Sequence, residues 1–95
     1  MTTAAPAIAD TACPRLAPHF MFRWEDSQDA YVLLYPEGLI KLNRSAGEIL
    51  NRCDGRSVAQ IIADLQATCP SQEVAIAEGT RAFIDLAHSK GWLKS

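Results

Sequence analysis

The side chains that could do chemistry in this 95-residue chain are few and widely spaced. The three cysteines are Cys13, Cys53 and Cys69, and the two histidines, His19 and His88, lie near neither each other nor a cysteine in sequence. A structural zinc site normally shows paired ligands at short spacing. We therefore expect no bound metal and no cofactor, and we expect the cysteines to be buried or idle thiols.

Motifs of known catalytic chemistry are missing from the sequence. It contains no Gly-rich phosphate loop, no HExxH and no GxSxG. Asp85 and His88 stand about one helical turn apart, but two potential ligands without a third are far more often a surface pair. We expect that the chain is not an enzyme.

Composition and charge indicate one small globular domain. Apolar residues make up 48% and charged residues 21%, and nine Lys and Arg against eleven Asp and Glu give a formal charge of −2. Nucleic-acid-binding domains usually carry a basic surplus. The longest apolar runs are far shorter than the ~20 residues of a membrane span. The N-terminus lacks the features of a signal peptide, so the expected location is the cytoplasm.

Residues 1–14 differ in character from the rest of the chain. They are small, polar or interrupted by proline, and they follow neither helical nor strand periodicity. We expect a flexible N-terminal tail, which could dock through Ile8 or become ordered on meeting a partner. Residues 15–94 are expected to form a single folded domain.

The first half of that domain has the pattern of three strands. Residues 20–24, 30–35 and 39–42 are rich in β-forming residues, and a polar cluster and a Pro-Glu-Gly turn separate them. Gly38 would permit a positive φ in the tight turn. Residues 30–35 are apolar on both faces, which is typical of a central strand. The pattern predicts an antiparallel meander with residues 39–42 at one edge.

The second half switches to helical periodicity. Ser45 and Glu48 match a capping box for a first helix, with Asn43 as a competing N-cap. Gly55 would end this helix as a C′ glycine.

Two more helices follow in the sequence. Ser57 and Gln60 match the next capping box, and Pro70 stops the second helix. Ser71 would cap the third helix, which runs to about Lys90. Three strands followed by three helices predict an α+β fold, and a winged-helix-like arrangement is the expected form.

The third helix and the edge strand together suggest a binding site for an extended peptide. The apolar residues of the helix cover more than the ~100° stripe that a surface helix needs. The edge strand 39–42 would present unpaired backbone groups, with Lys41 as a mild guard. An open edge beside an apolar helix is suited to β-augmentation, in which a peptide adds a strand. The alternative is that Phe83 and Leu86 simply fill the core.

Several short motifs resemble the PqqD family in their order and spacing. They are Leu33-Leu-Tyr-Pro-Glu-Gly38, Leu42-Asn43, Ala46, Ile49-Leu50, Cys53-Asp54-Gly55 and Gly91-Trp92-Leu93. The resemblance covers about residues 14–94, so only the N-terminal tail lies outside it. It implies a peptide chaperone of pyrroloquinoline quinone (PQQ) biosynthesis, built as a RiPP recognition element and without catalytic activity.

The resemblance also implies partners and site residues. The chaperone would bind the precursor peptide PqqA and present it to PqqE, a radical S-adenosylmethionine enzyme that supplies the chemistry and the metal. The peptide would add beside the third strand and pack on the third helix. In this sequence the implied peptide-binding residues are Leu39, Ile40, Lys41 and Leu42 on the strand and Arg81, Ile84, Asp85 and His88 on the helix. Trp24 is a candidate contact for PqqE, and a core tryptophan is the alternative.

Two other functions remain open at this point. The fold outline permits a winged-helix DNA-binding regulator, but Glu73, Glu78 and Asp85 outnumber Arg81 and Lys90 on the third helix. A recognition helix with net negative charge is badly placed against phosphates. A small enzyme acting on the peptide would need a base, nucleophile or metal set that the sequence does not show.

Overall fold

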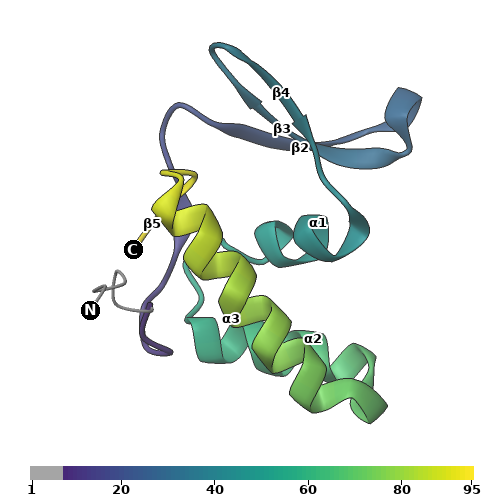
Figure 1. Cartoon of the computed structure of the whole chain (residues 1–95), viewed down its shortest axis with the longest axis vertical. Helices are drawn as coiled ribbons and strands as arrows, with labels where there is room; N and C mark the ends of the chain where they lie inside the picture. The colour runs from purple at the N-terminus through teal and green to yellow at the C-terminus, as the bar shows by residue number, and fades with distance from the viewer. Residues whose placement is uncertain (1–7) are drawn as a thin grey trace, which may run out of the picture.

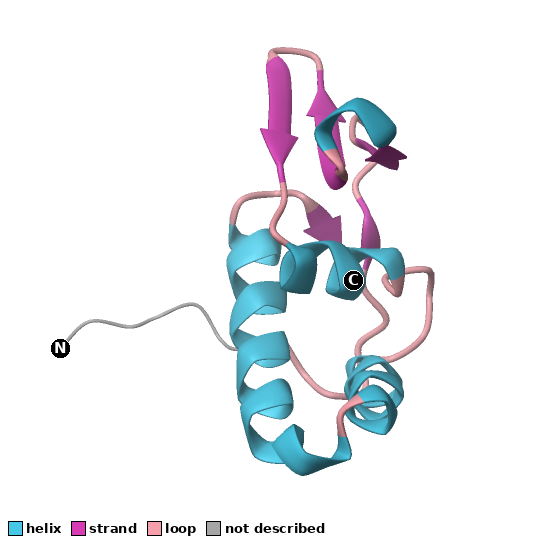
Figure 2. Ribbon diagram, turned by 90° about the vertical axis from the view of Figure 1, so that its right-hand side faces the viewer, coloured by secondary structure: helices cyan, strands magenta, loops and turns pink. Residues whose placement is uncertain are grey.

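The computed structural model describes residues 8–95 as two small antiparallel sheets and three α-helices. The elements are β1 (Arg15–Leu16), β2 (Met21–Glu25), β3 (Ala30–Tyr35), β4 (Gly38–Lys41), α1 (Arg44–Asn51), α2 (Val58–Thr68), α3 (Glu73–Ser89) and β5 (Leu93–Lys94), with 3-10 turns η1 (Asp26–Gln28) and η2 (Pro70–Gln72). The predicted α+β order of three antiparallel strands followed by three helices is confirmed. Helix α1 lies between the three-stranded sheet and the α2–α3 pair (Figures 1 and 2).

Strand β3 is the centre of the three-stranded sheet, as its apolar sequence predicts. The strand order is β2-β3-β4, and Val32 and Leu33 of β3 are fully buried. Tyr35 pairs with Gly38, so Pro36 and Glu37 alone form the hairpin turn. The expectation of a positive φ at Gly38 is wrong, because this pairing places the glycine inside β4 with ordinary extended backbone.

Asn43 is the N-cap of helix α1, and the capping box predicted at Ser45 and Glu48 does not form. The Asn43 side chain accepts a hydrogen bond from the Ala46 N–H at 2.8 Å and so satisfies one of the free donors of the first turn. Glu48 instead accepts a hydrogen bond from the Arg52 guanidinium at 2.7 Å. The helix ends at Asn51, so Gly55, whose φ is +110°, lies in the following loop.

The start of α2 matches the sequence prediction, whereas the start of α3 does not. Ser57 and Gln60 form the capping box, with the Ser57 N–H 2.8 Å from the Gln60 side chain and the Gln60 N–H 3.2 Å from the Ser57 hydroxyl. Ser71 does not cap α3, because it lies inside the 3-10 turn that Pro70 begins. Gln72 occupies the N-cap position without a side-chain hydrogen bond.

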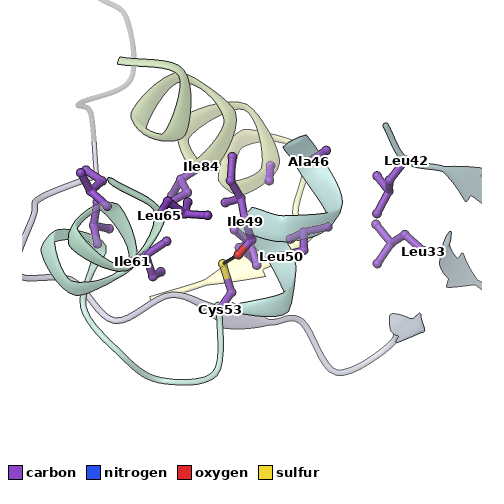
Figure 3. Packing of buried hydrophobic residues seen from close by; sticks show 13 residues of the cluster. Leu33, Leu42, Ala46, Ile49, Leu50, Cys53, Ile61, Leu65 and Ile84 are labelled. Atoms are coloured by element: carbon purple, nitrogen blue, oxygen red, sulfur yellow. Dashed lines mark hydrogen bonds between the residues drawn. The ribbon is translucent and has the colours of Figure 1, made fainter. Parts of the chain in front are cut away.

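The core lies where β3 and the three helices meet (Figure 3). Leu33 from the sheet, Ile49 from α1, Ile61 from α2 and Ile84 from α3 are among its buried side chains. In α2, the buried residues Val58, Ile61, Ile62 and Leu65 recur at helical spacing and so turn one apolar face of the helix inward. Among residues 8–95, no helix combines the length and apolar character that crossing a membrane requires.

A second, two-stranded sheet joins the two ends of the domain. Leu16 of β1 pairs with Leu93 of β5, and Leu93 is almost completely buried. The sequence suggested only that Trp92 and Leu93 tuck back after α3. Because the two strands are two residues each and far apart in sequence, no local pattern predicts their pairing.

The segment before β1 is attached to the helices. The Val58 and Ala59 N–H groups at the start of α2 donate to the Ala12 and Asp10 carbonyls at 2.9 and 3.0 Å. These two N–H groups belong to the first turn of the helix, where N–H groups have no hydrogen-bond partner within the helix, so the N-terminal segment supplies the acceptors. The predicted tail also includes residues 1–7, which lie outside the described residues.

Candidate peptide-binding edge and groove

The outer edge of β4 carries backbone groups that are free to pair with another strand. Among the described residues, β4 pairs only with β3. The Leu42 N–H donates to the Tyr31 carbonyl at 3.0 Å, and Tyr35 with Gly38 closes the hairpin. Hydrogen-bonded and non-hydrogen-bonded pairs alternate in an antiparallel ladder. The N–H and C=O groups of Leu39 and Lys41 therefore point outward, away from β3.

The side chains of this strand separate into an exposed pair and a packed pair. Leu39 is 49% exposed, and Lys41 is also exposed. Ile40 packs against the core and Leu42 is buried within it. Of the four predicted residues, Ile40 and Leu42 therefore anchor this segment to the core. Leu39 and Lys41 carry the unpaired backbone groups of the open edge.

A groove between α1 and α3 begins immediately after β4. Its volume is about 940 Å³, and it is widely open to solvent. The α1 wall is mainly polar, with Asn43, Arg44, Ser45, Glu48 and Arg52 besides the apolar Ala46 and Ile49, and the end of α2 adds Leu65 and Thr68. The α3 wall is mainly apolar and includes Ile76, Gly79, Thr80, Phe83 and Leu86. A segment bound here would therefore face polar groups on one side and apolar groups on the other.

Phe83 and Leu86 belong to this groove. Phe83 is half-buried, and the centroid of its ring lies 6.5 Å from that of Trp92, with the two rings tilted by 54°. Leu86 is 48% exposed and lines the groove. Leu86 therefore does not fill the core, and Phe83 does so only in part.

The four predicted helix residues lie elsewhere on α3. Ile84 is fully buried in the core. Arg81 donates to the Asp10 carboxylate, and Asp85 accepts from the Ile8 N–H at 2.8 Å, so both contact the N-terminal segment. His88 lies near the C-terminus, with its Nε2 atom 3.5 Å from the Ser95 hydroxyl.

The four residues therefore do not line the groove, and their role in peptide binding stays a prediction. The residues that do line it are spaced at three or four positions along α3, but that spacing also describes the buried face of the same helix. Two apolar stripes on one helix give a wide arc, and periodicity does not distinguish the stripe that packs from the stripe that stays open.

The ion pairs beside the groove tie α1 to α2. Arg52 contacts both Glu48 of its own helix and Asp64 of α2, and these two carboxylates raise the pKa of the Arg52 guanidinium. Arg56 pairs with Asp54 at 3.0 Å and holds the pKa of that carboxyl below its usual range. These contacts fix the end of α1 and so the position of the polar wall.

The three cysteines have different surroundings. Cys53 is buried, its thiol donates to the Ile49 carbonyl at 3.3 Å, and burial raises its pKa to about 12. Cys69 is exposed and lines the far end of the groove, whereas Cys13 is exposed outside it. Within residues 8–95, no group of three or more potential metal ligands comes together.

Comparison with known proteins identifies relatives over most of the chain. Residues 30–93 match the family model described as coenzyme PQQ synthesis protein D (PqqD). The "PqqA binding protein" of Stutzerimonas stutzeri strain A1501 is 46% identical, covering 88% of this chain and 91% of the relative. That of Pseudomonas aeruginosa strain UCBPP-PA14 is 48% identical, covering 85% and 88%.

A solved structure has the same fold. It is the solution NMR structure of the PqqD truncation of Methylobacterium extorquens PqqCD, described as a functional, stand-alone RiPP recognition element. It is 27% identical to this chain, with a TM-score of 0.77 and coverage of 94% of this chain and 96% of that chain.

Proposed function

We propose that this chain, which belongs to the PqqD family, binds the precursor peptide PqqA and takes part in this way in PQQ biosynthesis. Curated relatives that it matches over most of their length are PqqA-binding proteins, and the structural relative is described as a stand-alone RiPP recognition element. The proposed role is binding and presentation, with the chemistry left to another protein.

The observation that carries this proposal is the open edge of β4, from which the chain continues through Leu42 into the α1 wall of the groove at Asn43. An added peptide strand would hydrogen-bond to the outward N–H and C=O groups of Leu39 and Lys41. Backbone pairing of this kind supplies affinity for any extended segment. Side chains of the peptide that reach the α1–α3 groove would then supply the specificity.

The energetics of strand addition suit a protein that must release its cargo. A disordered peptide loses conformational entropy when it binds, so its affinity for a given buried area is modest. Holding the peptide close to an enzyme raises the effective concentration of the peptide there. We therefore propose that the chain hands PqqA to the radical S-adenosylmethionine enzyme PqqE.

The contact with PqqE would use a surface away from the peptide edge. Strand β2 forms the opposite edge of the sheet, and its Trp24 is 48% exposed. The Trp24 indole N–H donates to the Asp26 carboxylate at 2.7 Å, and the ring meets Tyr31 edge-on at 5.1 Å. We propose Trp24 as an enzyme contact because exposed, well-supported tryptophans are frequent anchors of protein interfaces.

The direct test is an NMR titration of the isotopically labelled chain with synthetic PqqA. Strand addition predicts slowed hydrogen exchange at the Leu39 and Lys41 amides and shift changes along the groove wall of α3. Shift changes confined to β2, or to the face of α3 that meets the N-terminal segment, would contradict this binding mode. Adding PqqE to the same sample should shift Trp24 without releasing the peptide.

A further inference from the structure

Gly79 occupies a position in α3 for which the fold itself supplies no reason. It lies in the middle of a 17-residue helix, where glycine is less favourable than alanine. A Cβ atom added at Gly79 would meet nothing within 4 Å. Gly47 in α1 is the opposite case, because a Cβ there would overlap the ring of Tyr31. Packing within the chain thus explains Gly47 and does not explain Gly79.

The space beside Gly79 belongs to the groove between α1 and α3. Ile76, about one turn before it, and Phe83, about one turn after it, both line the groove, and so do Ala46 and Ile49 of α1. Gly79 is exposed, so its missing side chain leaves open space within the groove, and these apolar residues line the same groove more than 4 Å from the position of a Cβ atom. We call this open space the notch. Thr80, the next residue, is almost completely buried, so the backbone at this point is held firmly.

The charge on the other wall indicates what else a bound segment must carry. Arg44 lines the groove, and no carboxylate of the described residues lies within 4.0 Å of its guanidinium. Glu48 and Arg52, which also line this wall, are paired with each other. The groove therefore has a mainly apolar wall on α3, which contains the notch, and a mainly polar wall on α1. The charged side chains of the α1 wall are two arginines and one glutamate, so its net charge is +1.

We propose that the notch at Gly79 receives one bulky apolar side chain of the bound peptide, and that Arg44 binds a carboxylate of the same peptide. The inference rests on the proposed function, because it assumes that the peptide enters the groove. Gly79 is then a specificity-determining residue, kept small for the ligand at a cost to helix stability. Filling the notch should therefore raise the stability of the folded chain and lower its affinity for the peptide, whereas a purely structural role for Gly79 would not lower the affinity.

The test compares two substitutions at Gly79 with a matched control on the same helix. Gly79→Ala and Gly79→Leu each replace glycine by a strong helix former, so the melting temperature should rise by roughly 4–8 °C. Gly79→Leu fills the notch and should weaken PqqA binding about tenfold or more in calorimetric titrations. Ala82→Leu adds similar bulk at an exposed position outside the groove and should leave the affinity unchanged.

Peptide variants identify the partner groups. Each bulky apolar residue of PqqA is replaced by alanine in turn, and every peptide variant is titrated against the wild-type chain and against Gly79→Leu. For the peptide variant that lacks the side chain bound in the notch, the two chains should have the same affinity. Arg44→Gln should weaken the binding of wild-type PqqA and make its affinity less dependent on salt. When the acidic peptide residue that contacts Arg44 is replaced by its amide, the wild-type chain and Arg44→Gln should bind the peptide equally well.

The outcomes separate this inference from the proposed function. If Gly79→Leu and the wild-type chain bind PqqA equally well, the notch is not a ligand site and the inference fails while peptide binding stands. Equal binding by Arg44→Gln overturns the carboxylate contact in the same way. If the wild-type chain does not bind PqqA, the proposed function and the inference fail together.

Discussion

Arg81 of α3 and Asp10 of the N-terminal segment form a two-pronged ion pair, although 71 positions separate them. The Arg81 Nε atom lies 3.1 Å from Asp10 Oδ1, and Nη2 lies 2.8 Å from Oδ2. One turn further along α3, Asp85 accepts from the Ile8 N–H. These contacts cover one face of α3 with the chain's own N-terminal segment, and the groove lies on another face.

The Arg81 ion pair should make the docking of the N-terminal segment sensitive to acid. The Arg81 guanidinium lowers the pKa of the Asp10 carboxyl below its ordinary value of about 3.9. A carboxyl with a lowered pKa in the folded state contributes stability above its unfolded pKa and loses it as the pH falls through the folded pKa. We expect the protection of the Ile8 amide, measured relative to its intrinsic exchange rate at each pH, to fall below about pH 4. Asp10→Asn should show low protection of this amide already at neutral pH, and a protection factor that does not change with pH in the wild type would contradict the role of the pair.

The two faces of α3 should differ in their effect on peptide affinity. Leu86→Ala removes an exposed side chain from the groove wall and should weaken PqqA binding about fivefold or more, as truncation of an interface anchor does. Arg81→Gln should leave the affinity nearly unchanged, because Asp10 already engages that side chain. Calorimetric titration of both variants decides the question, and the reverse ranking would favour the face that Arg81 occupies.

The backbone N–H of Lys41 offers a direct test of strand addition. Because this N–H points away from β3, Lys41→Pro removes it without removing a hydrogen bond of the sheet, and edge strands tolerate proline in that orientation. We expect the circular dichroism spectrum to stay the same and the affinity for PqqA to fall about tenfold or more. Lys41→Ala is the control for loss of the side chain. Unchanged binding by the proline variant would exclude pairing at this edge.

The three thiols should react at different rates with an aromatic disulfide reagent. Cys53 should be inert in the folded chain at pH 8, because it is buried and its pKa is about 12. Cys13 and Cys69 are exposed and should both react. Saturating PqqA should slow Cys69, which lines the groove, and leave Cys13 unchanged, as measured separately in Cys13→Ser and Cys69→Ser variants. Equal protection of both thiols would indicate a general tightening of the chain.

Much of the fold follows from local signals in the sequence. The apolar run of β3 predicted its central place, and the capping box at Ser57 predicted the start of α2. Both signals depend on neighbours a few residues apart, whose geometry is set by the strand or helix itself. The open edge at Leu39 and Lys41 could also be predicted, since an edge strand follows from the order of the strands.

Other features depend on residues that meet only in the folded chain. Asn43 and Ser45 were both plausible N-caps in the sequence, and in the folded chain the Asn43 side chain accepts the capping hydrogen bond from the Ala46 N–H. The pairing of Leu16 with Leu93 and of Asp10 with Arg81 brings distant segments together without a local signature.

The sequence by itself determined that this chain has a meander, three helices and an open strand edge, because periodicity and capping act within a few residues. Only the tertiary structure decided the rotation of α3. Its apolar arc is wide enough for several rotations, and packing of Ile84 into the core selects one of them. That rotation turns Phe83 and Leu86 toward the groove and places Arg81 and Asp85 in contact with the N-terminal segment.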